Sequence, residues 1–216
     1  MNQNTSKIHL EILDSKRRDL LRKLNAEFPD FILGGGTALA LQISHRQSFD
    51  LDFFGEKEIS RRLLEKLKKI IPIGKVARDT ADELTLYAND IKITFLSYPF
   101  PDFFQNVDIS EGTKYFSVQA IAAQKAYTIG RRGAWRDYFD FYSILKLGKS
   151  SITDIISGAS KVFGEVFNPK IFLEQLVYFD DLDDLSIVPI KNQTTASPEE
   201  IKDFLKAKVK EYLERE

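Results

Sequence analysis

The 216-residue sequence has no cysteine and only two histidines. The absence of cysteine excludes disulfides, thiol nucleophiles, iron–sulfur clusters and cysteine-based zinc sites. Two histidines are too few for a metal cage built from imidazole groups. Any chemistry that this chain performs must therefore rely mainly on carboxylates, lysines, hydroxyl groups and the backbone.

Long apolar runs are also lacking. No stretch approaches the roughly 20 apolar residues that a membrane-spanning helix needs, and residues 1–16 contain no run that resembles a signal sequence. We therefore expect a cytoplasmic protein without a membrane partner. The hydrophobic fraction of 43% is that of a folded chain with a core of ordinary size.

The sequence has no large excess of either charge, since it contains 31 Lys and Arg and 32 Asp and Glu. This balance argues against a globally basic nucleic-acid binder. A local patch is present nevertheless, because Lys125, Arg131, Arg132 and Arg136 follow one another without an intervening acid. Such a patch can cover a triphosphate or an RNA backbone.

Hydrophobic periodicity divides the chain into an α/β half and a helical half. In the first, the pattern predicts helices over residues 6–28, 37–43 and 61–71 and strands over 31–33, 49–54, 73–79, 84–88 and 91–96. In the second, it predicts helices over 118–129, 135–147, 152–163 and 170–179. A final helix begins after Ser197 as N-cap, with Pro198 at its first position, and runs to Leu213. We expect a core domain over 1–116 and a helical region over 117–216.

A run of three glycines, Gly34 to Gly36, precedes Thr37 where a strand meets a helix. Glycine permits close backbone approach, and a helix N-terminus offers unpaired N–H groups to an anion. The run is neither a P-loop nor a dinucleotide-binding fingerprint, because the required lysine and the third spaced glycine are absent. It is either a phosphate cradle or a tight strand-to-helix turn.

Two carboxylates, Asp50 and Asp52, interrupt an otherwise apolar strand. Side chains alternate along a strand, so the two share one face at a separation of ~6–7 Å while Leu51 points to the core. They either hold a hard cation such as Mg²⁺ or are two acids on a solvent-facing strand. Together with the glycine run they form one strand–helix–strand unit, which suits a nucleoside triphosphate and its metal.

This unit resembles the nucleotidyltransferase superfold, whose signature is a hydrophobic residue, a glycine pair and an Asp-x-Asp on the following strand. More narrowly, the sequence resembles the AbiEii/AbiGii toxin family of nucleotidyltransferases. The matching residues are Leu33, Gly35, Gly36, Thr37, His45, Arg46, Ser48, Asp50 and Asp52, then Lys125, Arg131, Arg132, Arg136, Asp137 and Asp140.

The resemblance implies an α/β (α+β) fold with a mixed sheet, flanking helices and a C-terminal helical region. It also implies a metal-dependent enzyme that transfers NMP from an NTP to an acceptor, which is RNA such as tRNA, a protein or a small molecule. An antitoxin protein is the implied partner. By resemblance, Asp50 and Asp52 hold Mg²⁺ or Mn²⁺ and act in catalysis together with Asp137, which either acts on the acceptor or positions Lys125. The implied nucleotide contacts are Gly35, Gly36, Thr37, Ser48, Lys125 and Arg132.

One departure concerns a third acid, which many nucleotidyltransferases carry on a later strand. The strand over residues 91–96 places Thr94 where we would look for it. A hydroxyl is a poor base and a weak metal ligand, so a catalytically weak or inactive nucleotide- or protein-binding module on the same fold stays open.

Four further residues have alternatives that the sequence leaves open. His45 and Arg46 follow the end of a predicted helix, where they either complement the helix dipole or contact the substrate. Asp137 and Asp140 are neighbours on one helix. They either take part in the reaction or pair locally with nearby arginines or a helix N-terminus.

Overall fold

The computed structural model of the protein describes residues 8–129, 131 and 134–215. The chain forms two compact units. The first, called here the sheet unit, runs to Gln42 and continues over Ser48–Phe116. The second, called the helical unit, contains Ile43–Gln47 and the chain from Ser117 onward. The chain therefore leaves the sheet unit for five residues in the middle of the predicted strand–helix–strand motif. That the two units are separate domains stays a prediction.

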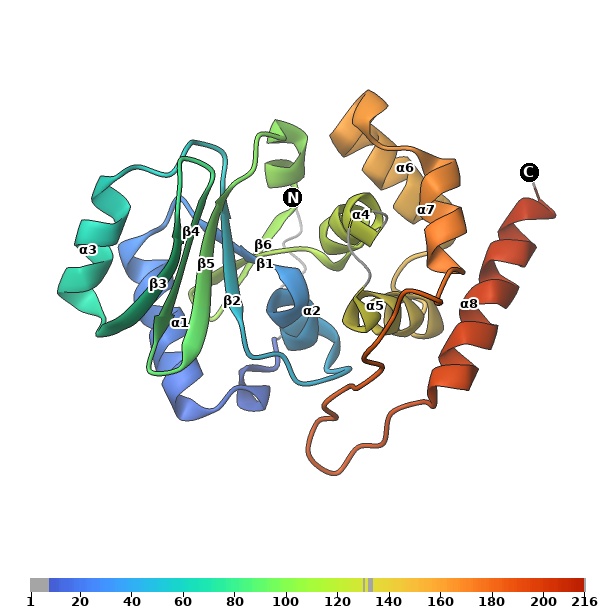
Figure 1. Ribbon diagram of the computed structural model, residues 1–216, viewed down its shortest axis with the longest axis horizontal. Coiled ribbons are helices and arrows are strands. Elements are labelled where there is room, and N and C mark those ends of the chain that lie inside the picture. Colours follow the sequence, from blue (N-terminus) through green and yellow to red (C-terminus); the bar gives the residue numbers. More distant parts are fainter. Residues whose placement is uncertain (1–7, 130, 132–133, 216) are drawn as a thin grey trace. The chain divides into compact units, whose positions relative to one another are not determined.

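The sheet unit is built on one seven-stranded sheet in the order β3-β4-β5-β2-β1-β7-β6 (Figure 1). Its strands are β1 (Ile32–Gly34), β2 (Leu51–Gly55), β3 (Ile73–Asp79), β4 (Glu83–Ala88), β5 (Ile91–Ser97), β6 (Val107–Ser110) and β7 (Thr113–Phe116). The β1–β7 and β2–β5 pairs are parallel, and the other pairs are antiparallel. The predicted mixed α/β fold is confirmed.

Helices cover both faces of this sheet, with α1 (Ser15–Glu27) and α3 (Arg62–Ile70) on one side and α2 (Gly35–Ile43) on the other (Figure 1). Short 3₁₀ turns occupy Leu10–Ile12 and Pro101–Gln105. The core includes buried leucines of α1 and α3, and Phe53 stacks on Phe95 of the neighbouring strand at 5.3 Å between ring centroids. Burial of these side chains supplies the driving force for folding.

Several boundaries differ from the sequence prediction. The first helix begins at Ser15 rather than at residue 6, because the Asp14 carboxylate accepts a hydrogen bond from the Arg17 N–H and caps it there. Strands β6 and β7 are absent from the prediction. They are only four residues long, and the two-residue turn between them, Glu111-Gly112, has glutamate in the left-handed region (φ 49°) where asparagine or aspartate usually precedes the glycine.

The helical unit consists of α4 (Val118–Ile129), α5 (Trp135–Lys146), α6 (Ile152–Phe163), α7 (Pro169–Leu176) and α8 (Pro198–Leu213), with a 3₁₀ turn over Gly164–Val166. The predicted start of α8 is confirmed, since the Ser197 hydroxyl accepts from the Glu200 N–H and Pro198 opens the helix. Helix α7 ends three residues earlier than predicted. Trp135 is buried.

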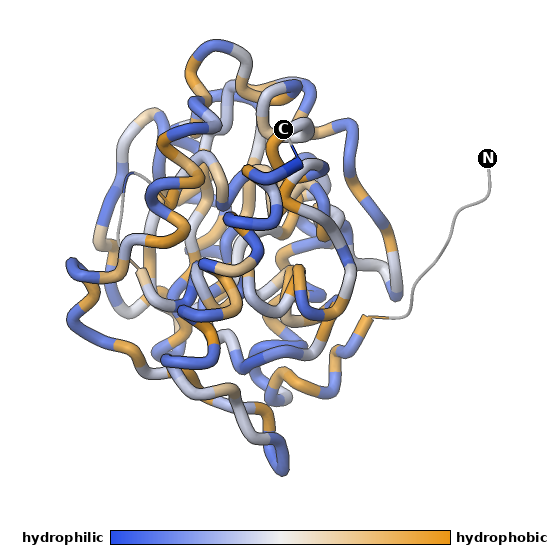
Figure 2. Tube along the Cα trace, turned by 90° about the vertical axis from the view of Figure 1, so that its right-hand side faces the viewer, coloured by the Kyte–Doolittle hydropathy of each residue, from blue (hydrophilic) through white to orange (hydrophobic). Residues whose placement is uncertain are grey.

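Hydrophobic and hydrophilic residues alternate along the tube in Figure 2. Within the described part of the chain, no helix combines the length and the apolar character needed to cross a bilayer.

Candidate active site

The glycine run and the second aspartate meet at the junction of β1 and α2. Gly34 pairs with Asp52 across the antiparallel β1–β2 ladder, and α2 begins at the next residue, Gly35. Gly35 has a φ of +64°, and a Cβ placed on it would lie 2.8 Å from Asp52 Oδ2. This close approach requires glycine. A carboxylate oxygen therefore lies against the backbone at the first turn of α2.

Asp50 lies just before β2 rather than within it, and two hydroxyl groups hold its segment against α2. The buried Thr37 hydroxyl contacts the Asp50 carbonyl and lies 2.9 Å from the Ser48 hydroxyl. Because a hydroxyl carries one hydrogen, Thr37 donates to the carbonyl and accepts from Ser48. Thr37 and Ser48 thus position the segment that carries Asp50. Their predicted contact with nucleotide stays a prediction.

Thr94 lies beside Asp52, as the strand alternation predicts. The two are partners in the parallel β2–β5 register, so their side chains share one face of the sheet. Thr94 is buried, and its hydroxyl lies 3.4 Å from that of Thr85 on β4. The neighbour of Asp52 on β5 therefore supplies a hydroxyl and no carboxylate.

The carboxylates present fit Mg²⁺. Among residues 8–129, 131 and 134–215, no three His, Asp or Glu side chains are close enough to share a metal ion. Magnesium is commonly bound by one or two carboxylates, with water and substrate phosphates completing the octahedron. Asp50 and Asp52 are such a pair, and both are half-buried beside the N-terminus of α2.

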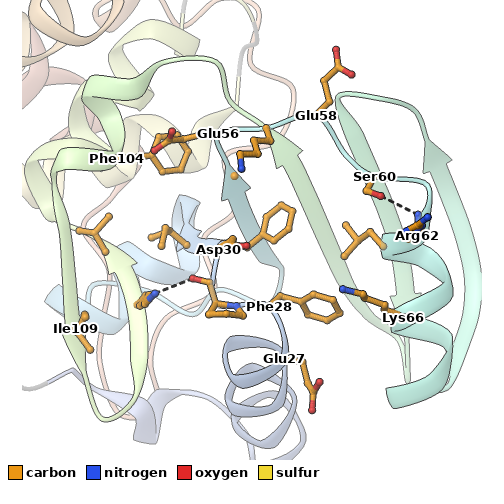
Figure 3. A pocket seen from close by; sticks show the side chains of 18 residues that line it. Glu27, Phe28, Asp30, Glu56, Glu58, Ser60, Arg62, Lys66, Phe104 and Ile109 are labelled. Atoms are coloured by element: carbon orange, nitrogen blue, oxygen red, sulfur yellow. Dashed lines mark hydrogen bonds between the residues drawn. The ribbon is translucent and has the colours of Figure 1, made fainter.

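A hollow of about 990 Å³ opens at the opposite end of β1 and β2, beyond Ile32 and Gly55 (Figure 3). Four basic residues line it, Lys57, Arg62, Lys66 and Lys114, and so do four acidic ones, Glu27, Asp30, Glu56 and Glu58. This balance gives a triphosphate no net attraction. The hollow is therefore a poor candidate for the nucleotide site, even though it is roomy.

The helical unit holds a buried ion network around Asp140 of α5. Lys125 Nζ lies 2.6 Å from Asp137 Oδ1 and 2.6 Å from Asp140 Oδ2. The three side chains are at most 3% exposed. Asp137 and Asp140 point to the same lysine because residues three apart on a helix are neighbours.

Two residues of the segment Ile43–Gln47, which belongs to the helical unit, complete the network. Arg46 binds Asp140 with two parallel contacts, Nε to Oδ1 at 2.7 Å and Nη2 to Oδ2 at 3.0 Å. His45 Nε2 lies 2.6 Å from Asp140 Oδ1, and its ring stacks on Phe139. These two residues therefore do not serve to complement a helix dipole. Arg46 forms a buried, bidentate ion pair with Asp140, and His45 contacts the same carboxylate. With a neutral imidazole, two cations meet two carboxylates.

Burial and charge act against each other on the pKa values in this network. Burial alone would raise the pKa of Asp140, but Lys125 and Arg46 hold it well below its usual 3.8. Burial would lower the pKa of Lys125, but Asp140 and Asp137 raise it above 10.5. For His45, burial outweighs the attraction of Asp140, and the pKa falls below 6.5. In the described structure its buried Nδ1 has no hydrogen-bond partner, so a proton placed there would gain no acceptor.

Stability should therefore decline as the pH falls below 6.5. The unfolded chain binds a proton at His45 there while the folded chain does not, so unfolding takes up a proton. We expect a slope of up to ~1.4 kcal/mol per pH unit in the free energy of unfolding. The His45→Gln protein should show a flatter profile between pH 6.5 and 5, measured by urea unfolding.

The chain offers a matched control in its second histidine. His9 is 44% exposed and pairs with Glu11, so His9→Gln should leave the slope as in the wild type. An unchanged slope in His45→Gln would contradict the assignment of this acid response to the buried imidazole.

The structure thus divides the predicted site residues between the two units. Gly35, Gly36, Thr37, Ser48, Asp50 and Asp52 come together in the sheet unit, whereas Lys125 and Asp137 pair in the helical unit. Arg132 lies outside the described residues. The expected basic patch loses Lys125, which is buried and paired with Asp137 and Asp140, whereas Arg131 keeps its charge and lies over the Tyr127 ring at 4.2 Å. The roles of Lys125 and Asp137 toward a nucleotide stay predictions.

Sequence reasoning missed the joining of His45 and Arg46 to Asp140. The only signal was the spacing of Asp137 and Asp140 on one helix with a lysine nearby. This spacing does not identify Arg46, which lies 94 residues from Asp140 in the sequence.

Comparisons with known proteins agree with this fold. The family model described as the nucleotidyl transferase AbiEii toxin of a type IV toxin–antitoxin system matches residues 18–100. A protein of Aquifex aeolicus (strain VF5), uncharacterized protein aq_aa25, is 30% identical over 194 residues, which cover 86% of this chain and 89% of the relative.

Two solved structures share the fold over most of their length. JHP933 from Helicobacter pylori has a TM-score of 0.59 at 21% identity, covering 96% of this chain and 95% of that protein. MenT4, a nucleotidyltransferase toxin from Mycobacterium tuberculosis H37Rv, has a TM-score of 0.57 at 14% identity, covering 88% of this chain and 79% of its own.

Proposed function

The chain belongs to the AbiEii family of nucleotidyltransferases, and we propose that it transfers NMP from an NTP to an acceptor with Mg²⁺ as cofactor. The observation that carries the proposal is the placement of Asp52 Oδ2 against Gly35 at the start of α2. One short segment then presents both backbone N–H groups for a triphosphate and carboxylates for its metal.

Each part of the site has a distinct task in this proposal. The N–H groups of Gly35 and Gly36 bind phosphate oxygens, and the missing side chain of Gly35 permits the close approach. Thr37 and Ser48 orient the segment that carries Asp50. In the reaction, the acceptor's nucleophile bonds to the α-phosphorus, its proton passes to water, and pyrophosphate leaves.

Asp50 and Asp52 would hold the metal. When bound there, Mg²⁺ would supply positive charge to the phosphate oxygens and help to align the acceptor with the leaving group. Thr94 beside Asp52 adds no charge to the pair, so the neighbouring position on β5 would contribute no third carboxylate to the metal.

The Gly35→Ala substitution tests the close approach. The new Cβ would meet Asp52 Oδ2 at 2.8 Å and would also occupy a left-handed conformation. We expect the rate of transfer to fall at least about 100-fold, because misplacement of a catalytic group by about 1 Å costs that much. The measurement is transfer of label from α-³²P-labelled NTPs to total RNA or to cell-extract protein in the presence of Mg²⁺.

Gly112→Ala is the matched control, since Gly112 has a φ of +76° and open space around its Cα. Its alanine would also occupy a left-handed conformation, which should cost about 1–2 kcal/mol of unfolding free energy. The new methyl group would not contact Asp52. Near-wild-type transfer by Gly35→Ala would contradict the proposed role of the glycine–carboxylate contact. Absence of transfer by the wild-type protein from every NTP tested would contradict the function itself.

We also propose that the physiological role is that of a toxin countered by an antitoxin protein, as the description of the matching family indicates. RNA, including tRNA, is the acceptor that we favour for the reason given in the next subsection. Expression of the active protein should then arrest growth, whereas the Asp50→Asn variant should be tolerated.

A second candidate is a nucleotide-binding module without turnover. Thr94 favours it, because the strand next to Asp52 carries no third acid. Calorimetry paired with the transfer assay separates the two: binding of Mg²⁺·NTP without pyrophosphate release supports the module.

A further inference from the structure

One face of the sheet carries a row of polar side chains that begins at Asp52. The strand register pairs Asp52 of β2 with Thr94 of β5, Thr94 with Thr85 of β4, and Thr85 with Arg78 of β3. Paired residues point to the same face. Neighbouring strands lie ~4.8 Å apart, so Arg78 lies about 14 Å from Asp52 across three strand spacings.

A second row runs parallel to the first on the same face. Lys92 of β5 pairs with Tyr87 of β4, and Tyr87 pairs with Lys75 of β3. Lys92 is two residues from Thr94 and Tyr87 is two from Thr85, so strand alternation places both rows on one side. The second row leads toward Asp50, because Leu51 pairs with Ile93, one residue beyond Lys92.

The outer end of both rows is open. Strand β3 is the edge of the sheet, and Lys75 and Arg78 are exposed. A hollow of about 630 Å³ lies at the outer end of the second row, lined by Lys75 and Tyr87 together with residues at the start of β3 and in the turn after β4. Arg78 meets Glu83 through Nε at 3.4 Å, but its side chain is still 57% exposed.

We propose that this surface, made of Lys75, Arg78, Tyr87 and Lys92, binds the backbone of a single-stranded nucleic acid whose end is the acceptor at Asp50 and Asp52. That the end of the strand accepts a nucleotide rests on the proposed transfer reaction. Basic side chains around an aromatic ring are the arrangement that binds single strands, since phosphates meet the cations and a base stacks on the ring. A lone triphosphate at Gly35 would not need cations about 14 Å away.

The test is binding of a fluorescein-labelled, single-stranded RNA 10-mer of mixed sequence to the full-length protein, without NTP or metal. Lys75→Gln/Arg78→Gln should bind on the order of tenfold more weakly at 0.1 M salt. The slope of log K against log salt should flatten by about 1.4, because each phosphate contact on a single strand contributes about 0.7. Tyr87→Leu should weaken binding at least about fivefold with an unchanged slope.

Lys66→Gln/Lys69→Gln is the matched control, because it removes two exposed charges of the same sign from α3. It should bind the RNA within about twofold of the wild type. Equal weakening by both double variants would overturn the proposal, since it would reflect net charge alone. Equally tight binding of a glutamate 10-mer, or weakened NTP binding with unchanged RNA binding, would also overturn it.

The transfer assay run in parallel distinguishes this inference from the proposed function. Wild-type transfer together with unaltered RNA binding by Lys75→Gln/Arg78→Gln overturns the surface and leaves the function standing. Loss of RNA binding in that variant, with no transfer by the wild type, supports the surface and overturns the function.

Discussion

The Asp52→Asn protein is expected to lose nucleotide transfer by at least about 10³-fold while remaining folded. The substitution removes a full negative charge from the point where the carboxylate meets the start of α2, with almost no change in shape. Loss of one preorganised electrostatic group commonly costs 10²–10³ in rate, and loss of a metal ligand adds to this. The measurement is the initial rate of label transfer at saturating NTP and Mg²⁺.

A matched control is Asp108→Asn, which removes the same charge from an exposed position on β6. It should transfer at the wild-type rate. Urea unfolding of both variants would show whether each is folded. An Asp52→Asn protein that is folded and retains more than a tenth of the wild-type rate would contradict the role given to this carboxylate.

The Asp140→Asn protein is expected to lose about 3–5 kcal/mol of unfolding free energy. Asp140 is fully buried and contacts Lys125, Arg46 and His45. Its replacement leaves two buried cations with the single carboxylate of Asp137. Removing one partner of a buried ion pair is costly because the remaining charge keeps its desolvation penalty. Urea unfolding at pH 7 measures the change.

Asp203→Asn serves as the control, since Asp203 is an exposed residue of α8 and its loss should change stability by no more than about 0.5 kcal/mol. A change below about 1 kcal/mol in Asp140→Asn would contradict the view that the network stabilises the helical unit. The network also anchors the five-residue segment Ile43–Gln47 that precedes Ser48, so transfer should decline in this variant as well.

The local features of the fold followed from the sequence. The strands β4 and β5 alternate clearly between apolar and polar residues, and the prediction found both of them together with the less regular β3. Ser197 before a proline marks the start of α8 because the cap and the first turn depend on neighbouring residues alone. The juxtaposition of the glycine run with Asp52 followed in the same way, since one strand–helix–strand unit of about 20 residues contains both.

The buried network did not follow from the sequence, because its partners are far apart in the chain. Arg46 reads as a helix-end cation until tertiary packing brings Asp140 within 2.7 Å of it. The sequence likewise predicts that Lys125 contacts a nucleotide. Only the packing of α4 against α5 shows that its charged side chain is buried and paired with Asp137 and Asp140. The register that aligns Asp52 with Arg78 also depends on the pairing of four strands, which no local pattern fixes.

The central claim is that Asp50 and Asp52 hold a divalent metal with the triphosphate at Gly35 and Gly36. Anomalous diffraction from crystals grown with Mn²⁺ and a non-hydrolysable NTP tests it most directly. The account predicts a manganese peak about 2 Å from a carboxylate oxygen of each aspartate, with phosphate oxygens against the first N–H groups of α2. A peak at any other carboxylates, or a triphosphate bound away from Gly35, would contradict it.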